Sequence, residues 1–168
     1  MKKHEVVIAI DPDCVKSGVA ELHISTRELI LKNMTFPELM NRLMFLKSAQ
    51  QRGAFPEFIV VVEAGWLVAK SNFHPWQGHM AEKIAKDVGA NHETGRKIIE
   101  MCQQYFNIDV VQQHPLKKHW KGANGKITHA ELSAFVPLKT KRTNQDERDA
   151  ALIAWCYANL PIVISKRK

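Results

Sequence analysis

The stretch Val6-Val7-Ile8-Ala9-Ile10-Asp11 is a continuous apolar run that ends in an acid. Such a run is typical of a strand that is buried on both faces of a sheet. A second run, Phe58-Ile59-Val60-Val61-Val62, ends in Glu63 in the same way. Sites in open α/β sheets form at the carboxyl ends of the strands. If the two strands are parallel neighbours, we expect Asp11 and Glu63 to lie side by side.

The segments around these runs predict one α/β domain over residues 1–168. Short connections after the first strand indicate an antiparallel meander that includes strands over 17–24 and 28–33. A short strand is expected over 108–111. Helices are expected over 37–52, 80–105 with a break near Gly89, 128–135 and 145–159. This order predicts a mixed five-stranded sheet with helices packed on both faces.

Two further acids, Asp146 and Asp149, begin the last predicted helix and share one face because they are three residues apart. That face continues as an apolar stripe, so both acids are expected to point toward the sheet. Helix capping and the helix dipole would also explain acids in a first turn. Clustered carboxylates, however, repel one another and are stable only when cations neutralise them. Oxygen ligands of this kind suit Mg²⁺, with Mn²⁺ as a substitute, and no small-molecule cofactor is expected.

Six of the seven net positive charges of the chain fall within residues 114–142. The only acid in this segment is Glu131, and its basic residues are Lys117, Lys118, Lys121, Lys126, Lys139, Lys141 and Arg142. A concentrated basic segment predicts a binding surface for a polyanion, although a solvated lysine-rich surface would have the same composition. Lysines beside a metal-binding acid cluster predict hydrolysis of a nucleic-acid phosphodiester.

Composition and spacing exclude several other classes. The three cysteines lie far apart and form no Cys-x-x-Cys pair, so neither a disulfide framework nor a structural zinc site is expected. No apolar run approaches the roughly 20 residues that span a bilayer, and the N-terminus lacks the features of a signal peptide. We therefore expect no membrane partner and a cytoplasmic location, at the nucleoid or, for a viral protein, in the host cytoplasm.

At these residues the chain resembles the RuvC-type Holliday-junction resolvases of the RNase H-like superfamily. Ile8-Ala9-Ile10-Asp11-Pro12, followed by Gly18, is similar to their first strand, and Val61-Val62-Glu63 to their second acidic strand end. Residues 144–152 resemble their final helix, whose two acidic positions are also three apart. The resemblance covers nearly the whole chain. It implies an RNase H-like nuclease fold and a homodimer that nicks a four-way DNA junction at two symmetric positions, using divalent metal.

The resemblance also implies roles for individual residues. It assigns metal ligation and catalysis to Asp11, Glu63, Asp146 and Asp149. It implies contact with the scissile phosphate for Lys117, with Gly122 five residues on, and for Lys126, although this chain is two residues shorter between these lysines. Charge alone adds Lys118, Lys121, Lys141 and Arg142 as phosphate contacts.

Trp66 lies three residues after Glu63, where the family has an aromatic residue that stacks on bases near the crossover. The alternative for Trp66 is a place in the core or in a dimer interface. The surrounding loop, residues 64–79, also contains Phe73, His74, Trp76 and His79. This loop is either a junction-reading element or a wall of the dimer. Zinc is not expected there, because no matching set of Cys and His accompanies the histidines.

Three other functions are compatible with parts of this pattern. An RNase H-like nuclease could act on an RNA–DNA hybrid or on structured RNA, because the fold does not fix the substrate. A DNA-binding module without catalysis would use the basic segment but would not need four clustered acids. An ATPase of the actin and sugar-kinase type needs two domains, and it needs phosphate-cradling glycines where this chain has Pro12-Asp13-Cys14.

Overall fold

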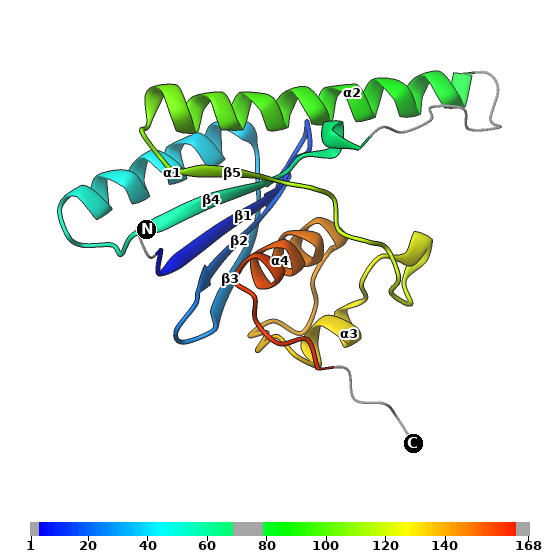
Figure 1. The fold of residues 1–168 in the computed structure, drawn as a ribbon. Helices are drawn as coiled ribbons and strands as arrows, with labels where there is room; N and C mark the ends of the chain where they lie inside the picture. Colours follow the sequence, from blue (N-terminus) through cyan, green and yellow to red (C-terminus); the bar gives the residue numbers. More distant parts are fainter. Residues whose placement is uncertain (1–3, 69–78, 164–168) are drawn as a thin grey trace.

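Five strands form one mixed sheet in the computed structural model, which describes residues 4–68 and 79–163 (Figure 1). The strands are β1 (Val6–Asp11), β2 (Ser17–His23), β3 (Glu28–Met34), β4 (Phe58–Glu63) and β5 (Val110–Gln113). Their order in the sheet is β3-β2-β1-β4-β5. The β1–β2 and β2–β3 pairs are antiparallel, whereas β1–β4 and β4–β5 are parallel. The predicted meander and mixed five-stranded sheet are confirmed, and the arrangement is that of an RNase H-like fold.

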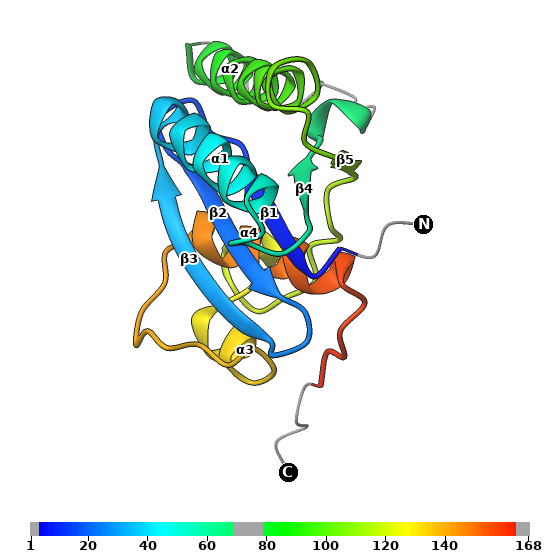
Figure 2. The ribbon, with the colours of Figure 1, turned by 90° about the vertical axis from the view of Figure 1, so that its left-hand side faces the viewer.

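Helices cover both faces of the sheet, as predicted (Figure 2). Helices α1 (Phe36–Gln51) and α2 (His79–Glu100) lie on one face, and α4 (Gln145–Tyr157) lies on the other, with the short α3 (His129–Ser133) beyond it. Thr35 starts α1 through a backbone N–H and a hydroxyl that both donate to the Glu38 carboxylate at 2.8 Å. Short helical turns η1 (Gly65–Leu67), η2 (Met101–Tyr105) and η3 (Ala123–Gly125) complete the described elements.

The expected break of the long helix near Gly89 is wrong. Helix α2 runs through Gly89 without interruption, because one glycine costs a helix only about 1 kcal/mol relative to alanine. Its C-terminal end continues into the wider helical turn η2, and after this turn the Ile108 N–H donates to the Cys102 carbonyl at 2.8 Å. Ile108 is thereby held in the core and does not pair in the sheet, so β5 begins at Val110 and not at residue 108.

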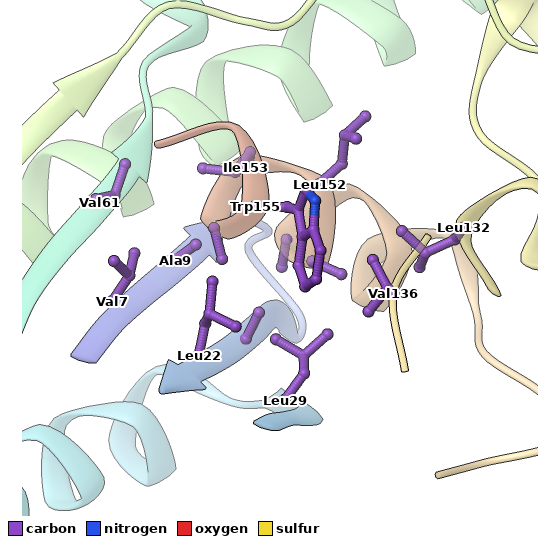
Figure 3. Close-up of a cluster of buried hydrophobic side chains, with 14 of the residues drawn as sticks. Val7, Ala9, Leu22, Leu29, Val61, Leu132, Val136, Leu152, Ile153 and Trp155 are labelled. Atoms are coloured by element: carbon purple, nitrogen blue, oxygen red, sulfur yellow. The ribbon is translucent and has the colours of Figure 1, made fainter. Parts of the chain in front are cut away.

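Two hydrophobic clusters, one on each face of the sheet, hold the layers together. Alternate residues of β1 divide between them: Val7 and Ala9 pack toward α4, whereas Ile8 and Ile10 pack toward α1 and α2. Trp155 is fully buried at the centre of the α4 side (Figure 3). The apolar character of β1 therefore follows from burial on both faces, as the sequence predicts.

The described residues also bear on two smaller expectations. The cysteines form no disulfide: Cys14 is exposed, Cys102 is buried and Cys156 is half-buried. None of the helices within residues 4–68 and 79–163 has the length and apolarity that crossing a membrane requires.

Candidate metal and nucleic-acid site

The register of the two central parallel strands places Asp11 beside Glu63. The pairing of β1 with β4 runs from Val6 opposite Phe58 to Ile10 opposite Val62. The next residue on each strand is an acid, so both carboxylates leave the sheet at the same edge. The two carboxylates repel each other, and the charge of Glu63 is one of the causes that raise the pKa of Asp11.

Helix α4 brings the other two acids to this edge. The Asn144 side chain accepts from the Glu147 N–H at 2.9 Å, and the Glu147 carboxylate accepts from the Asn144 N–H at 2.9 Å. This capping box occupies Glu147 and fixes the first turn, so that Asp146 and Asp149 face the sheet.

Gly18 allows the start of α4 to approach the sheet closely. It pairs with Asp11 across β1 and β2, and an added Cβ would lie 2.1 Å from the Asp146 carbonyl oxygen. Real Cβ atoms do not approach backbone oxygen so closely. Gly18 therefore lets the backbone of Asp146 pack against the strand beside Asp11.

A small hollow of about 80 Å³ joins these acids to the basic segment. Asp11, Glu63 and Asp149 line it on the side of the sheet and of α4. Lys117, Lys118 and Lys126 line it as well. The structure therefore brings together three of the four predicted acids and three of the predicted lysines. Asp146 does not line the hollow but lies within electrostatic reach of Asp11 and Lys126.

The pKa values of Asp11 and Asp146 are raised, as expected for acids that are held close together. Burial, and then the negative charges of Glu63 and Asp149, raise the pKa of Asp11 well above its usual value, while Lys126 opposes the shift. Burial and the nearby Asp13 raise the pKa of Asp146. The cluster thus favours any cation that can enter it.

Lys126 is the cation that the structure places there. Its Nζ donates to Asp149 Oδ2 at 2.8 Å, and the Gln145 amide donates to the other oxygen, Oδ1, at 2.7 Å. Within the described part of the chain, no three acidic, His or Cys side chains converge closely enough to hold a metal ion as they stand. The donor set is nonetheless of the all-oxygen kind that Mg²⁺ takes, and an ammonium group already occupies the position of a cation. The residues therefore fit a hard divalent ion in chemistry, once Asp149 turns from Lys126.

Trp66 does not stand free above the site. It is half-buried in η1, its Nε1 donates to Gln112 Oε1 at 3.2 Å, and the Arg96 guanidinium lies 5.2 Å from its ring centroid. Gly95 of α2 permits this contact, because an added Cβ would lie 2.6 Å from the ring. Trp66 also lines a second hollow, of about 250 Å³, together with Asp11 and Glu63. Base stacking by Trp66 stays a prediction, and the contact with α2 is the packing role that the sequence left open.

Several positioning residues were not singled out from the sequence. Arg148 donates to the Ile127 carbonyl at 2.9 Å and to Gln145 Oε1 at 2.8 Å, so it ties the residue after Lys126 to α4. Asn91 of α2 accepts from the Cys14 N–H at 2.9 Å and donates to Asp13 at 3.2 Å, which fixes the loop after Asp11. The only feature of the sequence that could have indicated Arg148 is its place between the two acids of α4. No feature of the sequence indicates a role for Asn91.

The remaining predicted residues lie away from the hollow. Lys121 is exposed, and its backbone N–H donates to the Glu131 carboxylate at 3.1 Å. Lys141 and Arg142 are exposed in the segment that leads into α4. Phe73, His74 and Trp76 lie outside the described residues.

Comparison with known proteins finds similar solved structures. No protein-family model and no curated protein sequence matches the chain. A solved structure of T. thermophilus RuvC in complex with a Holliday junction substrate matches at 18% identity and a TM-score of 0.49, over 92% of this chain and 93% of that one. A second Thermus thermophilus RuvC structure matches at 19% identity and a TM-score of 0.43, over 91% and 93%.

Replacing Gly18 by alanine should destabilise the protein by about 1–3 kcal/mol, because the added Cβ pushes α4 away from β2. Gly89→Ala is the matched control. An added Cβ at Gly89 meets nothing within 4 Å, so this change should stabilise the helix by up to about 1 kcal/mol. Urea unfolding followed by circular dichroism measures both changes. Equal stability of Gly18→Ala and the wild type would contradict the close approach of α4 and β2.

Proposed function

We propose that this protein is a metal-dependent endonuclease that resolves four-way DNA junctions by paired symmetric nicks. The observation that carries the proposal is the shared hollow in which Asp11, Glu63 and Asp149 meet Lys117 and Lys126. Acids alone would repel a phosphate backbone, and lysines alone would bind it without cleaving it. The two together suit hydrolysis of a phosphodiester that is held between them.

The carboxylates of Asp11, Glu63, Asp146 and Asp149 would hold Mg²⁺, or Mn²⁺ in its place. When bound, such ions supply activation of a water molecule and neutralisation of the charge that develops on the phosphate and the leaving oxygen. The sheet edge and α4 hold the four acids in place, so little reorganisation of the backbone is needed.

The basic residues would hold the DNA. Lys117 and Lys118 lie in the hollow beside the acids and would contact the phosphates next to the cleaved bond. Lys121, Lys141 and Arg142 are exposed and would contact more distant phosphates, adding affinity that falls as salt concentration rises. Trp66 lines the adjoining hollow and would meet bases that are unpaired at the branch point.

A homodimer suits two symmetric nicks, and α2 offers a surface for it. The N-terminal half of α2 projects beyond the sheet (Figure 1). Met80 and Ile84 lie four residues apart on it, so they share a face, and their exposed fractions are 64% and 50%. An exposed apolar pair on a projecting helix is a candidate for a protein contact. We also propose that the dimer works in the cytoplasm.

Cleavage of defined substrates tests the proposed activity. With Mg²⁺ or Mn²⁺ the protein should make paired nicks in a labelled four-way junction and leave a linear duplex and an RNA–DNA hybrid intact. EDTA, Asp11→Asn and Asp146→Asn should each abolish the nicks. Asp109→Asn, which removes a carboxylate from the start of β5 at the other end of the sheet, should leave them unchanged.

The stability of the same variants separates loss of chemistry from loss of fold. Asp11→Asn should be at least as stable as the wild type, because it removes one of several mutually repelling charges. Cleavage of the hybrid in place of the junction would contradict the junction substrate and indicate a ribonuclease. Tight metal-independent binding without any cleavage would contradict the enzyme and indicate a DNA-binding module.

Ile84→Glu should convert the dimer to a monomer, because a carboxylate cannot be buried unpaired in an apolar interface. We expect the dissociation constant to rise by about a hundredfold or more. Size-exclusion chromatography with light scattering measures the mass. Lys86→Gln lies on the opposite side of α2 and changes the net charge by the same amount, so it should remain dimeric. A monomeric wild type, or a dimeric Ile84→Glu, would contradict α2 as the interface.

A further inference from the structure

Lys126 is built into the acid cluster and is not a surface lysine that happens to reach it. Its side chain is 33% exposed and that of its partner Asp149 is 18% exposed. The turn before it is tight: the Gly122 N–H donates to the Lys126 carbonyl at 2.9 Å, and Asn124 and Gly125 adopt φ angles of 55° and 71°. Arg148 holds the carbonyl of the next residue, Ile127. The backbone on both sides therefore fixes where the lysine lies.

The charges around Lys126 suit an internal counter-ion. Burial by itself would lower the pKa of Lys126, but the hydrogen bond to Asp149 and the attraction of Asp11 and Asp146 raise it above its usual value. The same lysine opposes the upward pKa shifts of Asp11 and Asp146. One ammonium group thus partly neutralises three aspartates.

The same contact opposes the binding of a metal ion. Asp149 has one oxygen bonded to Lys126 and the other bonded to Gln145. The ammonium group of Lys126 lowers the negative charge that Asp149 offers to a metal ion beside Asp11 and Glu63. A divalent ion that enters therefore competes with Lys126 for Asp149.

We propose that Lys126 is an exchangeable counter-ion: it neutralises Asp149 in the metal-free protein, and binding of a divalent ion displaces it toward the phosphate side of the hollow. The inference rests on the proposed metal site and adds an order of events to it. Once displaced, the ammonium group stays beside Lys117 and Lys118, which line the same hollow, and adds to the charge that meets the DNA. Metal binding would in this way also strengthen DNA binding.

If the salt bridge between Lys126 and Asp149 were permanent, removing Lys126 would have the opposite effect on metal affinity. If Lys126 holds Asp149 in the orientation that a metal needs, removing the lysine must weaken metal binding. If Lys126 competes with the metal, removing it must strengthen metal binding. The two roles therefore predict opposite changes in metal affinity. A binding measurement distinguishes them without an activity assay.

Binding of Mn²⁺ to the DNA-free protein, followed by the electron paramagnetic resonance signal of free Mn²⁺, tests the exchange. Lys126→Met should bind Mn²⁺ about five- to tenfold more tightly than the wild type, because the competing charge of a partly buried pair is gone. Lys126→Gln, which keeps a hydrogen-bond donor but no charge, should tighten binding in the same direction and serves if the methionine variant fails to fold. Lys141→Met removes the same charge from an exposed position of the basic segment and should leave the affinity unchanged.

The outcomes separate this inference from the proposed function. Unchanged or weaker Mn²⁺ binding by the Lys126 variants, beside clear binding by the wild type, would overturn the exchange and leave the metal site intact. Equal tightening in Lys141→Met would also overturn it, because the effect would then come from net charge. Absence of Mn²⁺ binding in the wild type and all variants would overturn the metal site and the exchange together.

Discussion

Apolar packing on both faces of the sheet holds several carboxylates together at one sheet edge, although these carboxylates repel one another. Asp11 and Glu63 cannot avoid each other, because the register of β1 and β4 fixes both at the same level. Helix α4 adds Asp146 and Asp149 to the same edge. The energy that holds this arrangement comes from elsewhere, from apolar layers on both faces of the sheet and from Trp155 buried at the centre of one of them. Like charges concentrated in this way favour a cation beside them, and Lys126 supplies one.

The basic segment places positive charge beside the acid cluster. The basic segment returns from β5 past the acid cluster, so that Lys117 and Lys118 face the hollow while Lys126 enters it. The same segment continues to exposed lysines that can follow a phosphate backbone away from the site. Under the proposed function, this stretch of sequence has two electrostatic roles: it balances the acids and attracts a polyanion. This division explains why the net charge of the chain is concentrated there.

Local patterns predicted those parts of the site that depend on regular secondary structure. A buried strand that ends in an acid carries its carboxylate to the sheet edge, and acids three apart on a helix share a face, so Asp11, Glu63, Asp146 and Asp149 could be placed from the sequence. The pairing of Lys126 with Asp149 could not, because it depends on the left-handed conformations of Asn124 and Gly125 and on the contact of Arg148 with a distant carbonyl. The position of Trp66 likewise depends on how α2 packs over it at Gly95, which no local pattern gives.

The proposed function requires the acid cluster to be a divalent-metal site. The most direct test is the anomalous scattering of Mn²⁺ in crystals of the protein. We expect an anomalous peak within bonding distance of the Asp11, Glu63 and Asp149 carboxylates, with Asp149 turned away from Lys126. Crystals that take up Mn²⁺ only elsewhere, with the Lys126–Asp149 contact intact, would contradict it.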